Sequence, residues 1–434
     1  MADVSVREAQ AVLQSLQAGV VPRDGLQHLA VGRVAEVRQA LWELEALDQG
    51  GGVFKVVAGD YGSGKTFFLS LVRQVALARG YLVADADLAP DLRLRGEGRG
   101  LGTYRQLTAR LSSDSRRDGG ALQVVLDRWA DQVRAGAAER LGGAPPGGRT
   151  PAAAGAVDRE LRDRLRDIQE QPGGFSLAAV LRRHFEASLA GDEDGRQAAL
   201  RFLRGELRTP AEARALLRMA GLQPIGDATW YEHLRLLALL SVQAGYRGLL
   251  VMLDEGVNLY RIAQPESRAA NYEVVLRLLN DALQGRAPHL GVYLAGPPEM
   301  VSDARRGLYS YPALRTRLQA NPLADADHRD LAQPVLTLSP LTPDELLALL
   351  LKVRTLHAGF YGPTRVDAGD AEAWLGRLLA RPGAGRFLTV REALRSFIQA
   401  LNVLQQHPGL DKAAALGEAE EHVAQSRFVD VEMP

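Results

Sequence analysis

The sequence predicts an α/β fold built on a parallel sheet of five strands, and three observations lead to that prediction. Five short apolar runs alternate with segments of helical periodicity, which is the pattern of parallel strands joined by helices. The first run leads directly into a glycine-rich loop that ends in Lys-Thr. A long helical segment interrupts the runs after the second one, and another follows the fifth.

The five strand candidates are short, apolar and rich in β-branched residues, as expected of strands that are buried on both faces. In chain order they lie at 53–59, 81–88, 247–255, 289–296 and 334–341. Because the last three lie far along the chain from the first two, the sheet is expected to be completed only after a large insertion.

Helical segments surround these strands. Apolar residues recur at helical spacing over 5–19, 35–47 and 66–79. Segments with helical periodicity also dominate residues 90–245, where the Gly- and Pro-rich passage at 141–156 is typical of a flexible loop. From Thr342 to about His422 the chain is again expected to be helical, since Thr342 suits an N-cap and Pro343 suits the first helical position.

Composition and charge exclude several classes of protein. The 434 residues are 46% hydrophobic, enough for two or three domains with real cores. Lys+Arg and Asp+Glu balance at 52 each, so a globally basic nucleic-acid coat is not expected, although a local basic patch fits a zero sum. With no cysteine and eight scattered histidines, we expect neither disulfides nor a zinc site.

The start of the sequence, MADVSVREAQ, lacks a basic segment followed by an apolar run, so we expect no signal peptide. No window approaches the roughly 18 apolar residues that a membrane span requires. A soluble cytoplasmic protein without a membrane partner is therefore expected.

The segment GDYGSGKT at 59–66, called the phosphate loop here, fits the pattern G-x-x-x-x-G-K-[ST]. Its glycines permit a backbone whose N–H groups surround phosphate oxygens at the start of the next helix. Lys65 would reach the β- and γ-phosphates of ATP, and Thr66 would offer a hydroxyl to Mg²⁺. The other loop positions expected at the nucleotide are Gly59, Asp60, Tyr61, Gly62, Ser63, Gly64 and Phe67. The alternative, a glycine turn that merely contains Lys-Thr, is disfavoured by its place between a strand and a helix.

An acidic pair, Asp254 and Glu255, ends the strand candidate LLVMLDE at 249–255. The carboxyl ends of parallel strands form the edge at which ligands bind in such sheets, so the pair is expected there. Asp254 would hold Mg²⁺, directly or through water, and Glu255 would polarise the attacking water. The alternative is a strand that simply ends in two solvated acids. An acidic pair suits hydrolysis better than transfer to a second substrate.

The order of these segments resembles the AAA+ superfamily, especially its initiator-like and STAND-like branches. The segment AVGRVAEVRQAL (30–41) is similar to the family's GRE-x-E segment, which implies that Gly32 and Arg33 lie at the nucleotide. Val34 departs from the pattern, because an acid usually follows Gly-Arg. The resemblance implies an AAA+-like P-loop sheet that carries a helical lid.

Two further segments resemble functional parts of the same superfamily. VYLAGPPE (292–299) falls where a polar sensor residue usually ends the fourth strand, but Gly296 stands there. YPALRTRL (311–318) resembles the arginine-finger segment, in which Arg317 or Arg315 would reach the γ-phosphate in a neighbouring subunit. The alternative is that these arginines merely cover a helix face.

GRFLTVREALRSFIQAL (385–401) resembles the sensor 2 helix of the lid, with Arg391 the best candidate to reach the nucleotide. Arg386 and Arg395 are alternatives, and Arg391 and Arg395 share one helix face because they lie four residues apart. Ordinary solvated helix charges would produce the same pattern.

More narrowly, the ensemble resembles the BREX-type ATP-binding proteins, the BrxD-like family. VGR, GDYGSGKTFFL, LLVMLDEGVNLY, YPALRTRL and LTVREALRSFI carry this resemblance over most of the chain. It implies bacterial anti-phage defence, a partner helicase of the Lhr-like superfamily 2 type, and DNA as a common substrate.

The chain is expected to divide into four parts. These are N-terminal helices with the first part of the ATPase core (1–89), a mainly helical insertion (90–245), the second part of the core (246–340) and a helical C-terminal lid domain (341–434).

Candidate DNA contacts come from two basic, Gly-rich segments, RLRGEGRG at 93–100 and DSRRDGG at 114–120. The alternative is an ordinary solvated surface. A helix after the acidic pair could also present Arg268 and Asn271 to a ligand or to the next subunit, or pack on the sheet.

Three functions remain in view. The first is a Mg²⁺-dependent ATPase that forms homo-oligomers and acts on DNA with a helicase. The second is a nucleotide-controlled switch or scaffold with little turnover, which Gly296 favours. The third, a P-loop kinase for a small molecule, is disfavoured by the acidic pair and by the helical C-terminal segment.

Overall fold

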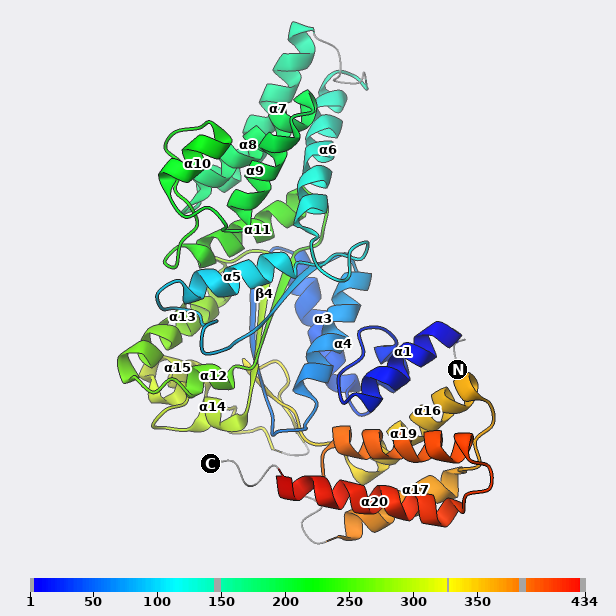
Figure 1. Ribbon diagram of the computed structural model, residues 1–434. Helices are drawn as coiled ribbons and strands as arrows, with labels where there is room; N and C mark the ends of the chain where they lie inside the picture. Colours follow the sequence, from blue (N-terminus) through cyan, green and yellow to red (C-terminus); the bar gives the residue numbers. More distant parts are fainter. Residues whose placement is uncertain (1–3, 144–149, 326–327, 382–387, 430–434) are drawn as a thin grey trace. The chain divides into compact units, whose positions relative to one another are not determined.

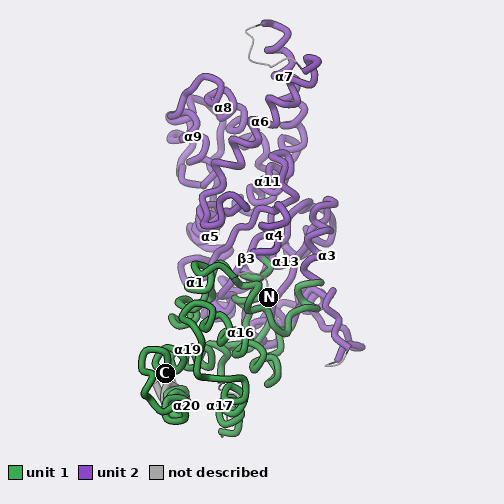
Figure 2. Tube along the Cα trace, turned by 90° about the vertical axis from the view of Figure 1, so that its right-hand side faces the viewer, with its two compact units in different colours: residues 1–38, 58–72, 337–434 green, residues 39–57, 73–336 purple. Residues whose placement is uncertain are grey.

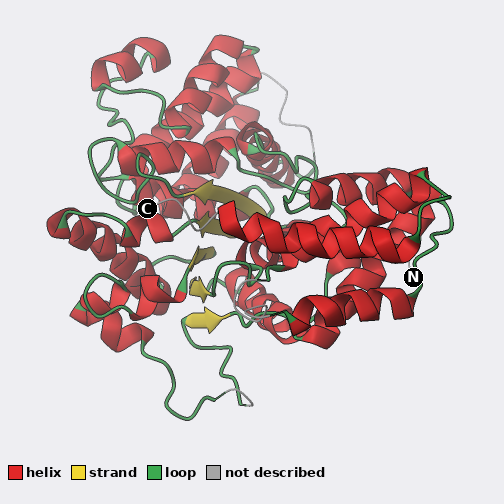
Figure 3. Cartoon of the chain, turned by 60° about the horizontal axis from the view of Figure 1, so that its bottom comes forward, coloured by secondary structure: helices red, strands yellow, loops and turns green. Residues whose placement is uncertain are grey.

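The computed structural model describes residues 4–143, 150–325, 328–381 and 388–429. Its strands form one five-stranded sheet, and helices and loops surround it (Figure 1, Figure 3). The strands are β1 Val53–Ala58, β2 Leu82–Asp87, β3 Leu249–Asp254, β4 Leu290–Gly296 and β5 Val335–Thr337. The predicted α/β fold with a parallel five-stranded sheet is confirmed.

The strands are arranged in the order β2-β3-β4-β1-β5, so β1 lies between β4 and β5. β2 pairs in parallel with β3, from Leu82 opposite Leu249 to Asp87 opposite Asp254. β3 pairs in parallel with β4, starting with Leu249 opposite Leu290. β4 is buried along its whole length and β3 up to Leu253, which explains the uninterrupted apolar runs in the sequence.

β5 is shorter than the run at 334–341 suggested. The Val56 N–H donates to the Pro334 carbonyl at 2.7 Å, and the Leu338 N–H donates to the Ala58 carbonyl at 2.7 Å. The strand ends at Thr337, and Pro340, which has no N–H group, could not continue a ladder.

The chain forms two compact units, shown in different colours in Figure 2. The first unit comprises residues 1–38, 58–72 and 337–434, and the second comprises residues 39–57 and 73–336.

The first unit is helical and has its own apolar core. Its elements are α1 Val6–Gln17, α2 Leu26–Leu29, the start of α3 Val34–Asp48, the start of α4 Lys65–Ala78, α16 Pro343–Tyr361, α17 Ala368–Ala380, α19 Val390–Gln406 and α20 Lys412–Val429. The rings of Trp374 and Phe397 are buried in this core with centroids 5.2 Å apart, and α1 packs against α16 and α19. Capping boxes open α16, α17 and α19, and the one at Thr342 begins α16 where the sequence placed a helix start.

The second unit contains most of the sheet together with a long helical region. Its helices are the rest of α3 and α4, α5 Arg99–Ala109, α6 Leu122–Arg140, α7 Pro151–Gln169, α8 Gly174–Ala190, α9 Glu193–Leu203, α10 Pro210–Leu217, α11 Trp230–Gln243, α12 Val257–Tyr260, α13 Pro265–Leu283, α14 Pro298–Ser302, the 3-10 turn η1 Leu308–Ser310 and α15 Pro312–Leu318. α6 to α9 pack against one another, and α11 contacts α5, α6, α7 and α8 (Figure 1).

The helices of this region follow from the local sequence. α6 buries Val125, Trp129 and Val133, which recur every four residues and so share one face. α7 begins with Thr150 as N-cap, whose hydroxyl accepts from the Ala153 N–H at 3.2 Å. Among the helices that the structure describes, none is long and apolar enough to cross a membrane.

Candidate functional site

The phosphate loop turns sharply between β1 and α4. Gly62 and Gly64 adopt φ angles of +82° and +87°, in the left-handed region that side chains disfavour. α4 begins at Lys65, whose ammonium group donates to the carbonyls of Gly59 at 2.7 Å and Asp60 at 2.9 Å. The loop is thus closed upon its own lysine, and its backbone N–H groups precede a helix N-terminus, where anions bind favourably.

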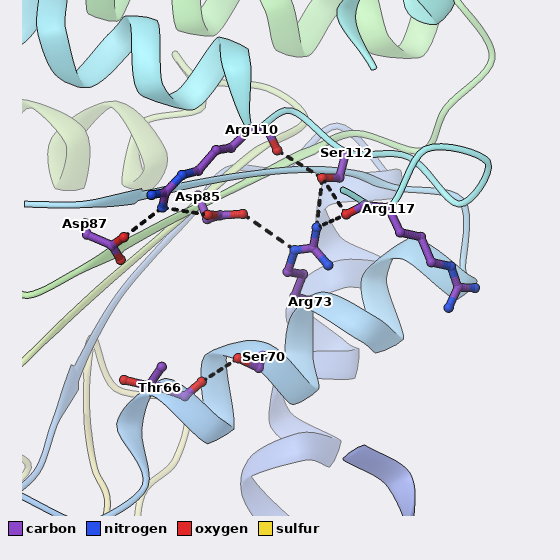
Figure 4. Close-up of polar contacts among 8 residues, drawn as sticks. All are labelled: Thr66, Ser70, Arg73, Asp85, Asp87, Arg110, Ser112 and Arg117. Atoms are coloured by element: carbon purple, nitrogen blue, oxygen red, sulfur yellow. Dashed lines mark hydrogen bonds and ion pairs between the residues drawn. The ribbon is translucent and has the colours of Figure 1, made fainter. Parts of the chain in front are cut away.

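The side chains of the loop point to different surroundings. A Cβ at Gly59 would collide with the Ser63 hydroxyl, which is buried and has no hydrogen-bond partner among the described residues. Tyr61 is 82% exposed, whereas Phe67 packs against the helical core of the first unit. Thr66 is exposed in the first turn of α4, where its carbonyl accepts a hydrogen bond from the Ser70 hydroxyl at 2.7 Å (Figure 4).

Arg33 is buried against the phosphate loop. One guanidinium nitrogen donates to the carbonyls of Ser63 at 2.9 Å and Ser339 at 2.6 Å, and the other lies 3.4 Å from a Glu36 carboxylate oxygen. Arg33 and Glu36 are 6% and 2% exposed. This arrangement joins the loop to the segment after β5, so the guanidinium of Arg33 is engaged by protein groups.

The sequence interpretation missed Glu36, although the signal was present. The expected acid is missing at position 34, where Val34 stands. Glu36 lies three residues after Arg33, and this spacing brings the two side chains to the same side. Gly32 is in the left-handed region, with a φ of +68°, and a Cβ there would collide with the Glu345 carboxylate. Glu345 belongs to the capping box of α16, so local packing explains this glycine.

The start of α19 lies beside the phosphate loop within the first unit. A Cβ at Gly62 would come within 3.0 Å of Cγ2 of Thr389, the N-cap of α19. Arg391 is exposed two residues later, and its Cδ would lie 3.4 Å from a Cβ at Gly19. Within the described parts of the chain, its guanidinium has no ion-pair or hydrogen-bond partner. Arg395 is also exposed, and Arg386 lies outside the described residues.

The acidic pair in the second unit has an unusual backbone. β3 ends at Asp254, and Glu255 adopts a φ of +56°, which is uncommon for a residue with a side chain. The Glu255 N–H donates to the Asp254 carboxylate at 2.8 Å, and Glu255 is exposed. Non-glycine residues in this conformation cost about 1–2 kcal/mol and concentrate at functional sites.

The end of β2 carries two further acids, Asp85 and Asp87, which contact arginines (Figure 4). Asp87 is the register partner of Asp254, and its carboxylate lies 2.7 Å from Arg110. Asp85 lies 3.2 Å from Arg110 and 3.6 Å from Arg73. These arginines offset the negative charge that gathers at this edge of the sheet, a role that the sequence interpretation did not consider.

β4 ends at Gly296, which offers no polar sensor side chain. Gly296 is buried, and a Cβ there would collide with the sulfur of Met300, so the flexible Met300 side chain would have to move to admit a larger residue.

The two finger candidates lie on the short helix α15. Arg315 and Arg317 are both exposed, while Leu314 and Leu318 bury the opposite face. Arg317 donates to the Ala313 carbonyl of its own helix at 2.9 Å, and Arg315 has no side-chain partner among the residues that the structure describes. Both side chains are therefore accessible on the surface of the second unit.

The order of the strands separates β1 from β3. The sheet is parallel, and β4 lies between these two strands. β1 ends at Ala58, directly before the phosphate loop, and β3 ends at Asp254.

Comparison with known proteins agrees with this arrangement. A family model described as BREX system ATP-binding protein BrxC/D matches residues 4–420. A comparison with curated proteins found no match. The matched range includes the phosphate loop, the acidic pair, α15 and α19, and the resemblance found in the sequence is confirmed. The chain belongs to the BrxC/D family of BREX system ATP-binding proteins.

Proposed function

We propose that this protein hydrolyses the ATP that it binds, and that hydrolysis drives a DNA transaction in BREX anti-phage defence. Lys65 and the loop N–H groups would hold the β- and γ-phosphates. Glu255 would accept a proton from the attacking water, and its exposed carboxylate after β3 suits that role. Arg33, engaged with Ser63 and Glu36, would position the loop rather than bind the base.

One observation carries the proposal most strongly. The acidic pair lies at the end of β3, which is two positions from β1 in the sheet, and Glu255 is in the left-handed conformation. The left-handed conformation costs about 1–2 kcal/mol, and a carboxylate positioned to activate water would account for that cost.

Thr66 and Asp254 fit Mg²⁺ by their chemistry, because a hydroxyl and a carboxylate are hard oxygen donors. Thr66 is exposed at the start of α4, and Asp254 is the last residue of β3. When bound with ATP, Mg²⁺ neutralises the charge that develops on the phosphate oxygens.

The protein would work as a homo-oligomer in the cytoplasm. Arg317, or Arg315, would enter the site of a neighbouring subunit, since both are exposed on α15. Arg391, exposed near the start of α19, would approach the phosphates in its own subunit. DNA and an Lhr-like superfamily 2 helicase are the partners proposed from family resemblance.

ATP turnover of the wild type and of Glu255→Gln, with and without DNA, tests the proposal when the mass of the oligomer is measured in parallel. We expect Mg²⁺-dependent hydrolysis that is lost in the variant while ATP binding remains. Full turnover in Glu255→Gln would remove the assigned base, and a strict monomer with ATP and DNA would remove the subunit-interface model.

A second candidate is a nucleotide-controlled switch with little turnover, and Gly296 favours it. Because β4 ends in glycine, this position offers no polar side chain to orient the attacking water. ATP binding that changes helicase association without measurable hydrolysis would support this candidate.

A further inference from the structure

Three arginines lie in the loop between β2 and α5 and at the first residue of α5, and none of them has an acidic partner among the described residues. Arg93, Arg95 and Arg99 form no ion pair and no side-chain hydrogen bond with any residue that the structure describes. Nε of Arg93 is buried without a partner, and burial, followed by the charge of Arg99, lowers the pKa of Arg93. Glu97, the one acid within 93–100, forms no ion pair in the described structure either.

The backbone of this loop is held firmly by two buried or half-buried side chains. Asn271 is fully buried, accepts from the N–H groups of Leu94 at 3.0 Å and Arg95 at 2.9 Å, and donates to the Arg95 carbonyl at 3.1 Å. Asp227 accepts from the N–H groups of Gly96, Gly100 and Leu101 at 3.1, 2.7 and 3.1 Å. The arginines are therefore displayed on a rigid support. Asp227 accepts from these backbone donors and forms no ion pair with the arginines in the described structure.

Two more arginines, Arg268 and Arg306, share the Ile262 carbonyl as an acceptor. Arg268 lies one turn before Asn271 on α13 and donates to the Ile262 carbonyl at 2.6 Å. Arg306 donates to the same carbonyl at 3.5 Å and lies over the Tyr260 ring, 5.5 Å from its centroid. Neither forms an ion pair with a described carboxylate. We call Arg93, Arg95, Arg99, Arg268 and Arg306 the arginine ridge.

Many arginines elsewhere in the same unit are paired with acids, although some, including Arg315 and Arg317, are not. Arg73 of α4 contacts Asp85 of β2, and Arg110 at the end of α5 contacts both Asp85 and Asp87 (Figure 4). In the helical region, paired arginines include Arg134, Arg140, Arg164, Arg182, Arg183 and Arg196. Of the two basic segments noted in the sequence, the second is also partly neutralised, since Arg117 lies 2.5 Å from Asp114.

We infer that the arginine ridge binds the phosphodiester backbone of a nucleic acid. Arginine offers planar pairs of donors that match phosphate oxygens, and each phosphate bound releases condensed counterions from the nucleic acid. Arg99 is also the first residue of α5, where the helix dipole disfavours a cation and favours a bound anion. The inference rests on the proposed action on DNA and assigns that action to a surface.

The spread of the ridge argues for a polymer rather than a single anion. Its five arginines come from the β2–α5 loop, from α13 and from the turn before η1. One phosphate ion would occupy at most a few of these donors, whereas a chain of phosphates can satisfy all of them in turn. The rigid loop means that little conformational entropy is lost when the chain binds.

The test compares the full-length protein with Arg95→Gln/Arg99→Gln in binding a fluorescein-labelled DNA oligonucleotide, by anisotropy and without nucleotide. The matched control is Arg162→Gln/Arg166→Gln on α7, which removes the same charge at positions 61% and 65% exposed. We expect the ridge variant to bind roughly tenfold more weakly, with a salt dependence shallower by about 1.4–1.8 in log–log slope. Thermal melting establishes that both variants are folded.

Equal losses in the two variants, or none in the ridge variant, would overturn the inference. So would competition by poly-glutamate as effective as that by unlabelled DNA, because it would indicate an acidic protein partner. Unlabelled RNA competing as well as DNA agrees with backbone recognition. The DNA-binding assay contains no nucleotide, so its result is independent of ATP hydrolysis. A wild type that hydrolyses ATP but does not bind DNA would contradict only the role of the arginine ridge. A wild type that binds DNA but does not hydrolyse ATP would contradict only the ATPase proposal.

Discussion

A guanidinium nitrogen of Arg33 donates a 2.9 Å hydrogen bond to the carbonyl of Ser63, inside the phosphate loop. The same nitrogen reaches Ser339 after β5, and Glu36 lies beside the other nitrogen. A carbonyl removed from water needs a hydrogen-bond donor, and a buried arginine needs an acid. The positions of Ser63, Ser339 and Glu36 are therefore coupled through Arg33. The loop is therefore shaped partly by residues outside its own motif.

Arg33→Ala is expected to reduce both stability and ATP affinity. The substitution leaves the buried Glu36 without this partner and two carbonyls without this donor, which costs about 3 kcal/mol of unfolding free energy. Urea unfolding and isothermal titration with ATP would measure the two effects. Arg38→Ala, at an exposed position of α3, is the control and should change stability by less than about 0.5 kcal/mol. Equal effects of both substitutions would contradict the positioning role.

Glu255→Gln is expected to lower ATP turnover by about a hundredfold or more, because the amide cannot accept the proton of the attacking water. ATP affinity should change little, since the loop and Lys65 are untouched. A coupled phosphate-release assay and a binding titration measure the two quantities. Parallel losses of binding and turnover would assign Glu255 to nucleotide binding instead.

The backbone at Glu255 predicts an unusual order of stabilities. With a φ of +56°, Glu255→Gly should be more stable than Glu255→Ala by about 1 kcal/mol, because glycine alone adopts this conformation without strain. Glu273, exposed within α13, is the control, where alanine should exceed glycine by about 1 kcal/mol. Chemical denaturation of the four variants checks both signs, and the same order at both positions would count against the strain.

Mixing two inactive variants tests whether an arginine of α15 acts between subunits. Arg317→Ala should lose about a thousandfold in turnover if Arg317 stabilises the transition state. An interface formed by an Arg317→Ala subunit and a Glu255→Gln subunit can still combine an intact base with an intact arginine. Turnover of the mixture should therefore exceed that of either variant alone. Arg315→Ala replaces Arg317→Ala in a second mixture, and absence of recovery in both would rule out action in trans.

Acid is expected to destabilise the second unit through His184. Burial, more than the opposing charge of Asp127, lowers the pKa of His184 to about 4, from an ordinary value of 6.5. Between these two pH values the unfolded chain binds a proton that the folded chain does not, so unfolding free energy falls as pH falls. One such histidine gives a slope of about 1.4 kcal/mol per pH unit.

His184→Gln should reduce the pH dependence of the unfolding free energy by about 1.4 kcal/mol per pH unit, which corresponds to one proton. Denaturation at several pH values measures this slope. His328→Gln is the control, because His328 is 81% exposed. An unchanged slope in His184→Gln would mean that another group binds the proton. His233 and His357, whose pKa values burial also lowers, are the next to examine.

Much of the fold followed from local pattern. The apolar runs predicted five strands, because strands buried on both faces tolerate few polar residues. The helix start at Thr342 followed from capping chemistry that lies within four residues of sequence. The extent of β5 did not follow, since the apolar run at 334–341 continues past the point where pairing with β1 ends.

The candidate site divides in the same way. The sequence alone predicted the phosphate loop and the acidic pair as candidate sites, because binding phosphate and activating water each need particular residue types at adjacent positions. The engagement of Arg33 with Ser339 joins residues 306 apart, and the packing of Gly296 against Met300 depends on how α14 approaches β4. Contacts of this kind depend on tertiary packing, which motif spacing does not encode.

The sequence by itself determined the α/β class and the family, and it predicts which residues suit phosphate, Mg²⁺ and water, because short-range chemistry specifies those residue types. Only the tertiary structure decided that Arg33 supports the loop, that Glu255 is in a left-handed conformation, and that the arginines at 93–99 lack acidic partners while many others are paired. Pairing of charges depends on which distant side chains come within a few ångströms, and only the folded chain brings them there.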